Sequence, residues 1–411
     1  MLTGTNLQFA NSYNNRIILE TIRLYGPLSR VGIARLTQLT AQTVTNITKK
    51  LLQAGLIVED SRKQDGPGAP SILLRVNENA AYSIGIDFDK DHLTAILVNF
   101  SGKIRQKITM DMDFPSPYET IEEMERMVKE LIGRHGIDLD LIWGVGIGVP
   151  GPLVVSKGST LKNTINPKAM PGWENVPIVS ELESRLHLPV VLENNASAAA
   201  IGEFWYGDGK HMNSFFYVYF GAGLGGGLVL GGQLYSGYTG NAGELGYFPT
   251  PVLQGVAPSG VPDHLGEYFN IPRLYKQLRQ KNFPVSSLRD LERLFLGHNT
   301  HVKEWIDAGS GALLPLILAI EYLIDPEAIF FGGRLPEPLL ASLLEQLEGS
   351  MPEHRTDQKP VRPEFRIASA GEDAAAMGVA TIPLYTSFAP IPKVIMKTKG
   401  PLSDTFARAH R

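Results

Sequence analysis

The chain has 411 residues, too many for one ordinary hydrophobic core, so we expect two or three domains. With 43% hydrophobic and 19% charged residues, its composition is typical of a folded globular protein rather than a disordered one. It contains no cysteine, which excludes disulfides and thiolate metal sites and is compatible with a cytoplasmic location. No apolar run reaches about 18 residues and the first residues lack the pattern of a secretory signal, so neither a membrane span nor export is expected.

Charge is divided unevenly along the chain. Residues 1–76 contain nine Lys and Arg against four Asp and Glu, a net charge of +5. The remaining residues contain 29 against 38, a net charge of −9. A basic N-terminal region on an acidic body is typical of proteins that contact nucleic acid.

The N-terminal region has the pattern of a winged helix-turn-helix. Apolar residues recur at helical spacing, and Gly26-Pro27 ends the first helix. Ser29 and Thr40 are candidate N-caps of the second and third helices. The expected elements are helices at 9–25, 30–39 and 41–55 and strands at 56–59 and 71–76. Three helices followed by a hairpin predict a DNA-binding domain at residues 1–78.

The third predicted helix places short polar side chains on its outer face, where they suit base edges, and neighbouring cations suit phosphates. Two other interpretations remain open: an ordinary solvated face, or a winged helix that binds protein. The predicted DNA-binding residues are Gln42, Thr43, Thr45, Asn46, Lys49, Arg62 and Lys63, with Lys50 as a further phosphate contact.

From residue 81 onward, strands and helices alternate, with glycine-rich turns at strand ends. This pattern predicts an α/β architecture whose ligands bind at the carboxyl ends of the strands. We expect one lobe at 79–205, a second at 206–385 and a binding cleft between them, while the tail at 386–411 has no assigned role. Strand–turn–helix order is expected again across residues 215–235.

Five glycines between Gly221 and Gly227 predict a backbone that comes close to a ligand, because glycine permits positive φ and has no Cβ to block the approach. Polar side chains that could bind a small polyol flank this segment. They are Glu193, Asn194, Asn195, Asn241 and Glu244.

Seven motifs, in order, make nearly the whole chain resemble the ROK family. They are IGVPGPL (147–153), MPGW (170–173), LPVVLENNASAAAIGE (188–203), GAGLGGGLVLGGQLYSG (221–237), GNAGELGY (240–247), FFGGRL (330–335) and GEDAAAMG (371–378). That family groups sugar kinases with sugar-responsive repressors on a two-lobed actin/hexokinase-like fold. The attached winged helix resembles the repressor branch, which includes the glucose, N-acetylglucosamine and xylose regulators.

The departures from the family pattern argue against an enzyme. The first phosphate loop of the kinases is rich in glycine, whereas here Asp87 is followed by Phe88-Asp89-Lys90-Asp91, whose acidic groups would repel a triphosphate. Ala222 stands where the second phosphate loop has Thr. Asn195 stands where the kinases have their catalytic Asp, and an amide is no base at neutral pH.

The family's zinc site is also missing its ligands. Tyr247 occupies the position of the zinc-binding His, the three Cys are absent, and a proline-rich loop at 249–262 is expected to be ordered by its prolines instead. His264 is expected to be a surface residue or to pack the loop, since one imidazole does not make a structural zinc site. We therefore predict no metal and no cofactor.

The resemblance implies that Asn194, Asn195 and Glu244 bind sugar hydroxyl groups. Tyr247 could keep a contact in place of the family His. Glu267 is favoured over the aligned Gly266, and Asn166 is a possible substitute for the family Asn that aligns with Ala169. The alternative is that these groups cap helices and satisfy loops. A ketose, a deoxy or acidic sugar, a polyol or a disaccharide all remain possible ligands.

These features together predict a cytoplasmic, sugar-responsive transcriptional repressor that binds operator DNA as a homodimer or a dimer of dimers. We expect a sugar in the cleft to close the lobes and lower operator affinity. If the sugar instead raises operator affinity, it acts as a co-repressor. The alternatives are a ROK sugar kinase with an attached DNA-binding domain and a sugar sensor that acts through protein contacts.

Overall fold

The computed structural model describes residues 7–63, 70–112, 116–155, 162–165, 170–173, 176–249, 264–357 and 359–385. The predicted proline-rich loop between Pro249 and Pro262 lies almost wholly outside these ranges, as does the C-terminal tail.

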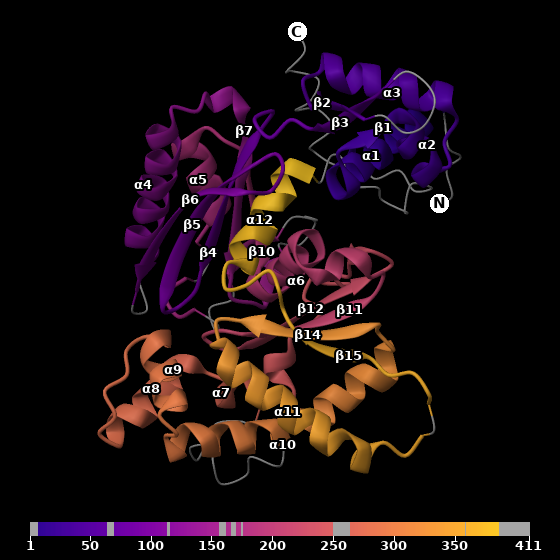
Figure 1. Cartoon of the computed structure of the whole chain (residues 1–411). Coiled ribbons are helices and arrows are strands. Elements are labelled where there is room, and N and C mark those ends of the chain that lie inside the picture. Colours follow the sequence, from indigo (N-terminus) through magenta and orange to yellow (C-terminus); the bar gives the residue numbers. More distant parts are fainter. Residues whose placement is uncertain are drawn as a thin grey trace.

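The N-terminal region forms the predicted winged helix-turn-helix (Figure 1). Its elements are α1 (Leu7–Tyr25), β1 (Leu28–Ser29), α2 (Arg30–Thr37), α3 (Ala41–Gln53), β2 (Ile57–Lys63) and β3 (Ser71–Val76). Both predicted N-caps are confirmed, since the Ser29 hydroxyl accepts from the Gly32 N–H at 3.1 Å and that of Thr40 from the Thr43 N–H at 3.2 Å. The sequence does not predict strand β1, because two residues show no periodicity. This strand completes a sheet of order β1-β3-β2.

The first lobe is built on a five-stranded sheet of order β10-β7-β4-β5-β6. Its strands are β4 (Tyr82–Phe88), β5 (His92–Asn99), β6 (Ile104–Asp111), β7 (Ile142–Val149) and β10 (Val190–Asn194). Strands β4, β7 and β10 are parallel, whereas β5 and β6 join as antiparallel hairpins. Helices α4 (Pro117–His135) and α5 (Ile178–Leu186) pack one face through Met124, Val128 and Leu182. A short turn, η1 (Leu139–Leu141), leads into β7, and a small hairpin, β8 (Leu153–Val155) and β9 (Lys162–Ile165), follows it.

The second lobe has a five-stranded sheet of order β13-β12-β11-β14-β15. Its strands are β11 (Phe215–Phe220), β12 (Leu224–Leu230), β13 (Gln233–Leu234), β14 (Ala328–Gly333) and β15 (Glu364–Ile367). The helical elements are η2 (Asp208–His211), η3 (Leu245–Tyr247), α7 (Leu265–Tyr268), α8 (Ile271–Gln280), α9 (Leu288–Leu296), α10 (Thr300–Ile324) and α11 (Glu337–His354). The expected strand–turn–helix at 215–235 is wrong, because β11 and β12 are antiparallel neighbours joined by the glycine turn.

Two small-residue helices, α6 (Asn195–Tyr206) and α12 (Ala374–Tyr385), lie between the two sheets (Figure 1). Helix α12 returns to the first lobe, where Gly85 and Gly146 clear space for it. A Cβ on Gly85 would lie 1.9 Å from the Ala376 carbonyl oxygen. The sequence predicted that the second lobe includes all of residues 206–385, but α12 packs on the sheet of the first lobe.

The glycines of the 221–227 segment serve packing more than ligand approach. None of these described glycines has the positive φ that glycine permits. A Cβ on Gly225 would lie 2.7 Å from the Ala196 Cβ, and one on Gly227 would lie 2.4 Å from the Ala200 Cβ. Strand β12 is therefore rich in glycine because α6 packs directly on it, and Gly223 in the turn is the position that faces open space.

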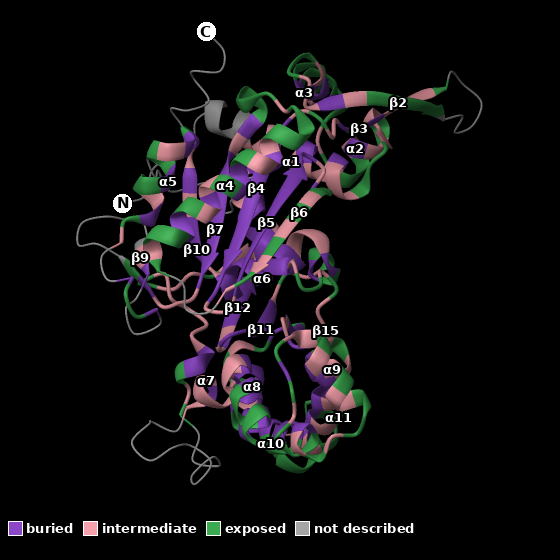
Figure 2. Ribbon diagram, turned by 90° about the vertical axis from the view of Figure 1, so that its left-hand side faces the viewer, coloured by how far each residue is buried: buried purple, intermediate pink, exposed green. Residues whose placement is uncertain are grey.

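Helix α10 is long and apolar enough, by length and composition, to span a membrane, but 56% of its most apolar window is buried inside the protein. Val302, Ile306, Leu313 and Ile317 are fully buried in the hydrophobic cluster of the second lobe. In Figure 2 the helix lies beside α8 and α11, at the end of the second lobe that is far from the N-terminal domain. This is the pattern of a core helix.

Candidate functional site

A cavity of about 300 Å³ lies where the two lobes meet. It contains five of the six predicted sugar-binding residues; the sixth, Asn166, lies outside the described residues. The lining residues are Asp89, Lys90, Pro150, Gly151, Asn194, Asn195, Ala196, Tyr219, Ala222, Gly223, Leu224, Gly225, Glu244, Gly246, Tyr247, His264, Gly266, Glu267 and Asn270. The volume falls at the lower end of the range of small-molecule sites.

Asn194 and Glu244 form a pair at one side of the cavity. The Asn194 Oδ1 accepts from the backbone N–H groups of Ala196 and Ser197 and so caps α6. Its Nδ2 donates to Glu244 Oε1 at 3.2 Å. Gly151 lies against this pair, because a Cβ there would be 2.0 Å from the Asn194 Nδ2. Asn194 therefore has a structural role in the cap and also presents its amide beside the Glu244 carboxylate.

Asn195 and Tyr219 bring unsatisfied polar atoms to the cavity. The Asn195 Nδ2 donates to the Phe88 carbonyl oxygen at 3.2 Å. Its Oδ1 is buried and has no hydrogen-bond partner within the described residues, and the same is true of the Tyr219 hydroxyl. Buried polar atoms are rarely left unpaired, so both atoms are notable; the Asn195 Oδ1 lies 2.9 Å from the place that a Cβ on Gly148 would occupy.

Tyr247 and His264 form the outer wall. Tyr247 is 52% exposed, and its ring centroid lies 5.8 Å from that of His264. The His264 Nδ1 makes a 2.7 Å hydrogen bond with the Gly246 carbonyl oxygen, a contact that agrees with the predicted loop-packing role. Among the described residues, no three His, Asp or Glu side chains gather as metal ligands.

Glu267 reaches the cavity and is held by Arg273, whose Nη1 lies 3.0 Å from the Glu267 Oε2. The backbones of the neighbouring Gly266 and of Gly246 lie close together, since a Cβ on Gly266 would be 3.0 Å from the Gly246 Cα. A larger residue at position 266 would fit only if one of the two backbones moved.

Two flanking residues that could have bound a polyol do not line the cavity. Glu193 Oε1 accepts from the Asn194 N–H at 2.9 Å. Asn241 holds the backbone of Leu153, with its Oδ1 2.6 Å from the N–H and its Nδ2 3.0 Å from the carbonyl oxygen. Asn241 therefore joins the second lobe to the start of β8. The sequence contained no signal for this distant contact.

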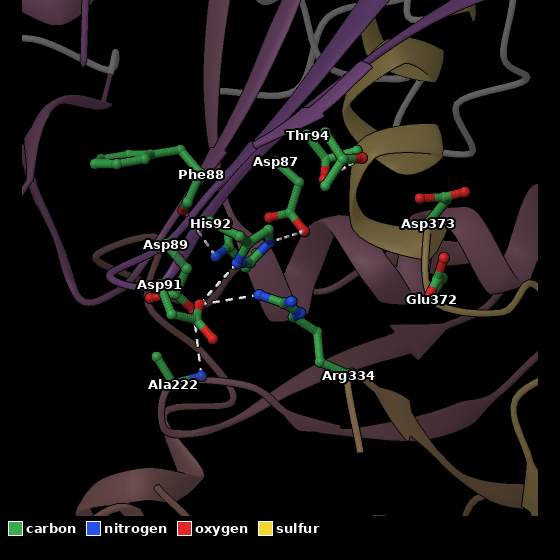
Figure 3. Close-up of polar contacts among 12 residues, drawn as sticks. Asp87, Phe88, Asp89, Asp91, His92, Thr94, Ala222, Arg334, Glu372 and Asp373 are labelled. Carbon is green, nitrogen blue, oxygen red and sulfur yellow. Dashed lines mark hydrogen bonds and ion pairs between the residues drawn. The ribbon is translucent and has the colours of Figure 1, made fainter. Parts of the chain in front are cut away.

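A buried cluster of charges links the lobes beside the cavity, and Figure 3 shows its members (Asp87, Asp89, Asp91, His92 and Arg334). His92 lies between Asp87, at 3.1 Å, and Asp91, at 2.8 Å. Arg334, which follows β14 of the second lobe, donates to Asp91 Oδ1 at 2.9 Å. We call this set the interlobe cluster. The sequence indicated only that these acids would repel phosphate.

The ionisation of the interlobe cluster follows from its contacts. Burial alone would lower the pKa of His92, but the charge of Asp87 and the hydrogen bonds to Asp87 and Asp91 raise it to about 9. Burial opposes the ionisation of Asp91, yet the hydrogen bond from His92 and the charge of Arg334 hold its pKa below the ordinary value. His92 is therefore a cation at neutral pH and binds both carboxylates.

Asp89 lies across from the glycine turn of the second lobe. Its Oδ2 is 3.4 Å from the Ala222 backbone N–H, and its Oδ1 accepts from the Lys90 N–H at 2.8 Å. Burial, aided by the charge of Asp91, raises the pKa of Asp89 to about 6. A carboxylate of the protein therefore faces the backbone amide of the glycine turn (Figure 3).

The predicted DNA-contacting face of α3 is accessible (Figure 2). Gln42, Thr45, Asn46 and Lys49 are exposed, Thr43 is half-buried, and the Gln42 Nε2 donates to Asn46 Oδ1 at 3.2 Å. Arg62 is exposed on β2; the side chain of Lys63 lies outside the described part of the structure. The opposite face of α3, through Val44, Ile47 and Leu51, is buried in the core of the N-terminal domain.

Known proteins share both the sequence and the fold. A putative xylose repressor of Caldicellulosiruptor sp. is 34% identical over 57% of this chain and 58% of its own length. A glucokinase of Halalkalibacterium halodurans is 26% identical over 72% of this chain and 92% of its own. The crystal structure of a ROK family transcriptional regulator, a homolog of the E. coli MLC protein, superposes with a TM-score of 0.67 at 20% identity and covers 94% of this chain and 99% of that one.

The family model described as "ROK family" matches residues 83–384, which include both lobes and the cavity between them. The order of the seven motifs and the two-lobed fold agree with that match. The chain belongs to the ROK family, and the proteins similar to it include a putative xylose repressor and a ROK family transcriptional regulator.

Proposed function

We propose that this protein is a sugar-responsive DNA-binding transcriptional repressor whose operator affinity changes when a sugar or sugar derivative binds in the interlobe cavity. The observation that carries the proposal is the position of α6. This helix begins at Asn194 and Asn195, in the wall of the cavity. Its last turn contains Trp205, which contacts Arg23 of the N-terminal domain. The twelve residues of α6, about 18 Å of helix, connect the cavity to the contact between Trp205 and Arg23.

Helix α12 strengthens this connection. It is packed tightly on α6, because a Cβ on Gly378 would lie 1.8 Å from the Ala198 carbonyl oxygen. Ala380 and Leu384, further along α12, share one buried cluster with Ile18 and Ile22 of α1. A shift of the helix pair would therefore reach the DNA-binding domain. A sugar can cause such a shift only if it binds one arrangement of the lobes better than the other.

The site favours binding over phosphoryl transfer. Asn195 offers an amide where a kinase of this family has its catalytic base, and Asp89 faces the amide of Ala222 in the glycine turn. A coupled assay of ADP release with ATP and a panel of sugars tests this interpretation. We expect no turnover; clear turnover by the unmodified protein would favour the alternative, a sugar kinase with an attached DNA-binding domain.

The regulatory proposal is tested by operator binding. An operator selected from random-sequence DNA is titrated by fluorescence anisotropy with and without a sugar that raises the melting temperature in a thermal-shift screen. We propose that the protein is cytoplasmic and binds a palindromic operator as a homodimer, or as a dimer of dimers, through paired winged helices. The sugar is expected to weaken operator binding; stronger binding would replace induction by co-repression.

The sugar site has a matched pair of variants. Glu244→Gln removes a carboxylate in the cavity wall, and we expect sugar affinity to fall by about tenfold to a hundredfold. Glu304→Gln, on an exposed turn of α10, is the control and should leave sugar affinity unchanged. If both variants bind the sugar with equal affinity, the sugar does not bind beside Glu244.

Salt dependence separates DNA binding from a sensor that acts through protein contacts. Lys49→Ala should weaken DNA binding across sequences and lower the slope of log affinity against log salt by about 1. Lys303→Ala, at an exposed position of α10, is the control. If no salt-dependent DNA binding is observed, the protein-contact alternative is favoured.

A further inference from the structure

The charge of the cavity restricts its ligand. Asp89 is 4% exposed and lines the cavity on the side of the glycine turn, while Glu244 lines it beside Asn194. Glu267 adds a third carboxylate, which Arg273 already binds. Lys90 is the one lysine among the described lining residues, and no arginine lines the cavity there. The two cations of the interlobe cluster are both paired, Arg334 with Asp91 and His92 with Asp87 and Asp91.

The turn at Ala222 and Gly223 would bind an anion in a chain without Asp89. Gly223 has open space where its Cβ would stand, and the Ala222 N–H points at the cavity side of the turn, where Asp89 Oδ2 meets it at 3.4 Å. A carboxylate held there repels a second anion and competes for the same N–H donor. The protein thus supplies its own anion at the point where a phosphate group would bind.

Of the two unsatisfied atoms named above, the Tyr219 hydroxyl can donate or accept, whereas the Asn195 Oδ1 requires a hydrogen-bond donor. The Asn195 Oδ1 is an acceptor that is buried without a partner within the described residues. The carboxylate of Glu244 also accepts, and hydroxyl or ammonium groups can donate to both. A phosphate dianion offers acceptors alone, so it cannot satisfy Asn195 and adds repulsion from Asp89.

We propose that Asp89 is a specificity residue that excludes phosphorylated and acidic sugars, so that the effector is an uncharged sugar, a polyol or an amino sugar. The inference rests on the proposed function and narrows it. The sequence left an acidic sugar open as the ligand, and this inference excludes it. Specificity of this kind comes from a repulsive group placed against the wrong ligand as well as from contacts to the right one.

The test compares each free sugar with its own phosphate ester on the full-length protein. Glucose, fructose, N-acetylglucosamine, xylose and maltose are titrated by calorimetry, each beside its monophosphate. We expect at least one free sugar to bind and its ester to bind at least tenfold more weakly. An ester that binds as tightly as its free sugar overturns the inference and leaves the proposed function standing. If no free sugar and no ester binds, the proposed function fails and the inference fails with it.

Asp89→Asn tests the assigned residue directly. The amide is the same size and carries no charge, so the preference for free sugar over ester should shrink by at least about tenfold. Asp140→Asn, at an exposed position of the first lobe, is the control and should keep the wild-type preference. If Asp89→Asn keeps the full preference, Asp89 is not its cause. The comparison on the unmodified protein remains decisive even if this variant does not fold.

Discussion

Arg23→Ala is expected to disconnect the sugar site from the DNA-binding domain. Arg23 lies on α1, with its guanidinium carbon 4.2 Å from the centre of the Trp205 ring. Its Nη1 also donates to the Trp205 carbonyl oxygen at 3.3 Å, and its side chain is 8% exposed. The contact joins the N-terminal domain to the end of the helix that begins at the cavity.

The size of the effect follows from these two interactions. A largely buried cation–π contact contributes about 1–2 kcal/mol, and a hydrogen bond from a charged donor contributes about 1.5 kcal/mol or more. The two share one guanidinium and do not add fully, so we take about 2 kcal/mol. This energy corresponds to a factor of about 30 in an equilibrium constant. It is the upper limit on the allosteric response that this contact can transmit.

The assay measures the ratio of operator dissociation constants with and without saturating sugar. In Arg23→Ala we expect this ratio to move toward 1 by up to about thirtyfold, while sugar affinity changes little. Arg134→Ala, an exposed arginine on α4, is the matched control and should keep the wild-type ratio. A folded Arg23→Ala variant with an unchanged ratio would refute transmission through Trp205.

Two further predictions concern stability. Gly378→Ala places a Cβ 1.8 Å from the Ala198 carbonyl oxygen and should lower the free energy of unfolding in urea by about 1–3 kcal/mol or more, whereas Gly349→Ala, with open space in α11, should be neutral or stabilising. A Gly378→Ala protein as stable as wild type would show that α6 and α12 can separate. Folding raises the pKa of His92 from 6.5 to about 9, so protonated His92 stabilises the folded state. This stabilisation is fully present below pH 6.5 and is lost as pH rises through about 9. Melting temperatures from pH 6 to 10 should therefore fall less steeply in His92→Gln than in wild type; parallel curves would show that His92 carries no such linkage.

Local patterns were sufficient to predict most elements of the fold. The N-caps Ser29 and Thr40, the amphipathic α3 and the buried strands around Val145 depend on residues close in sequence, so their periodicity is visible without a structure. The cavity residues were also largely predictable, because Asn194, Asn195 and Glu244 lie within motifs that the family shares. Short elements such as β1 and β8 were missed, since two or three residues show no period.

The sequence by itself determined the winged helix, the two lobes and the amide at position 195, because each depends on residue type at a position within a recognisable local pattern. Tertiary structure alone decided how the chain uses its glycines and charges. The Asp89 contact with Ala222 joins residues 133 apart, and the Arg23 contact with Trp205 joins residues 182 apart. Neither has a local signature, because both arise from the packing of α6 and α12 between two separate sheets. Glycines of β12 allow α6 to pack directly on the strand, and the meeting of the two lobes places the Asp89 carboxylate beside the Ala222 N–H.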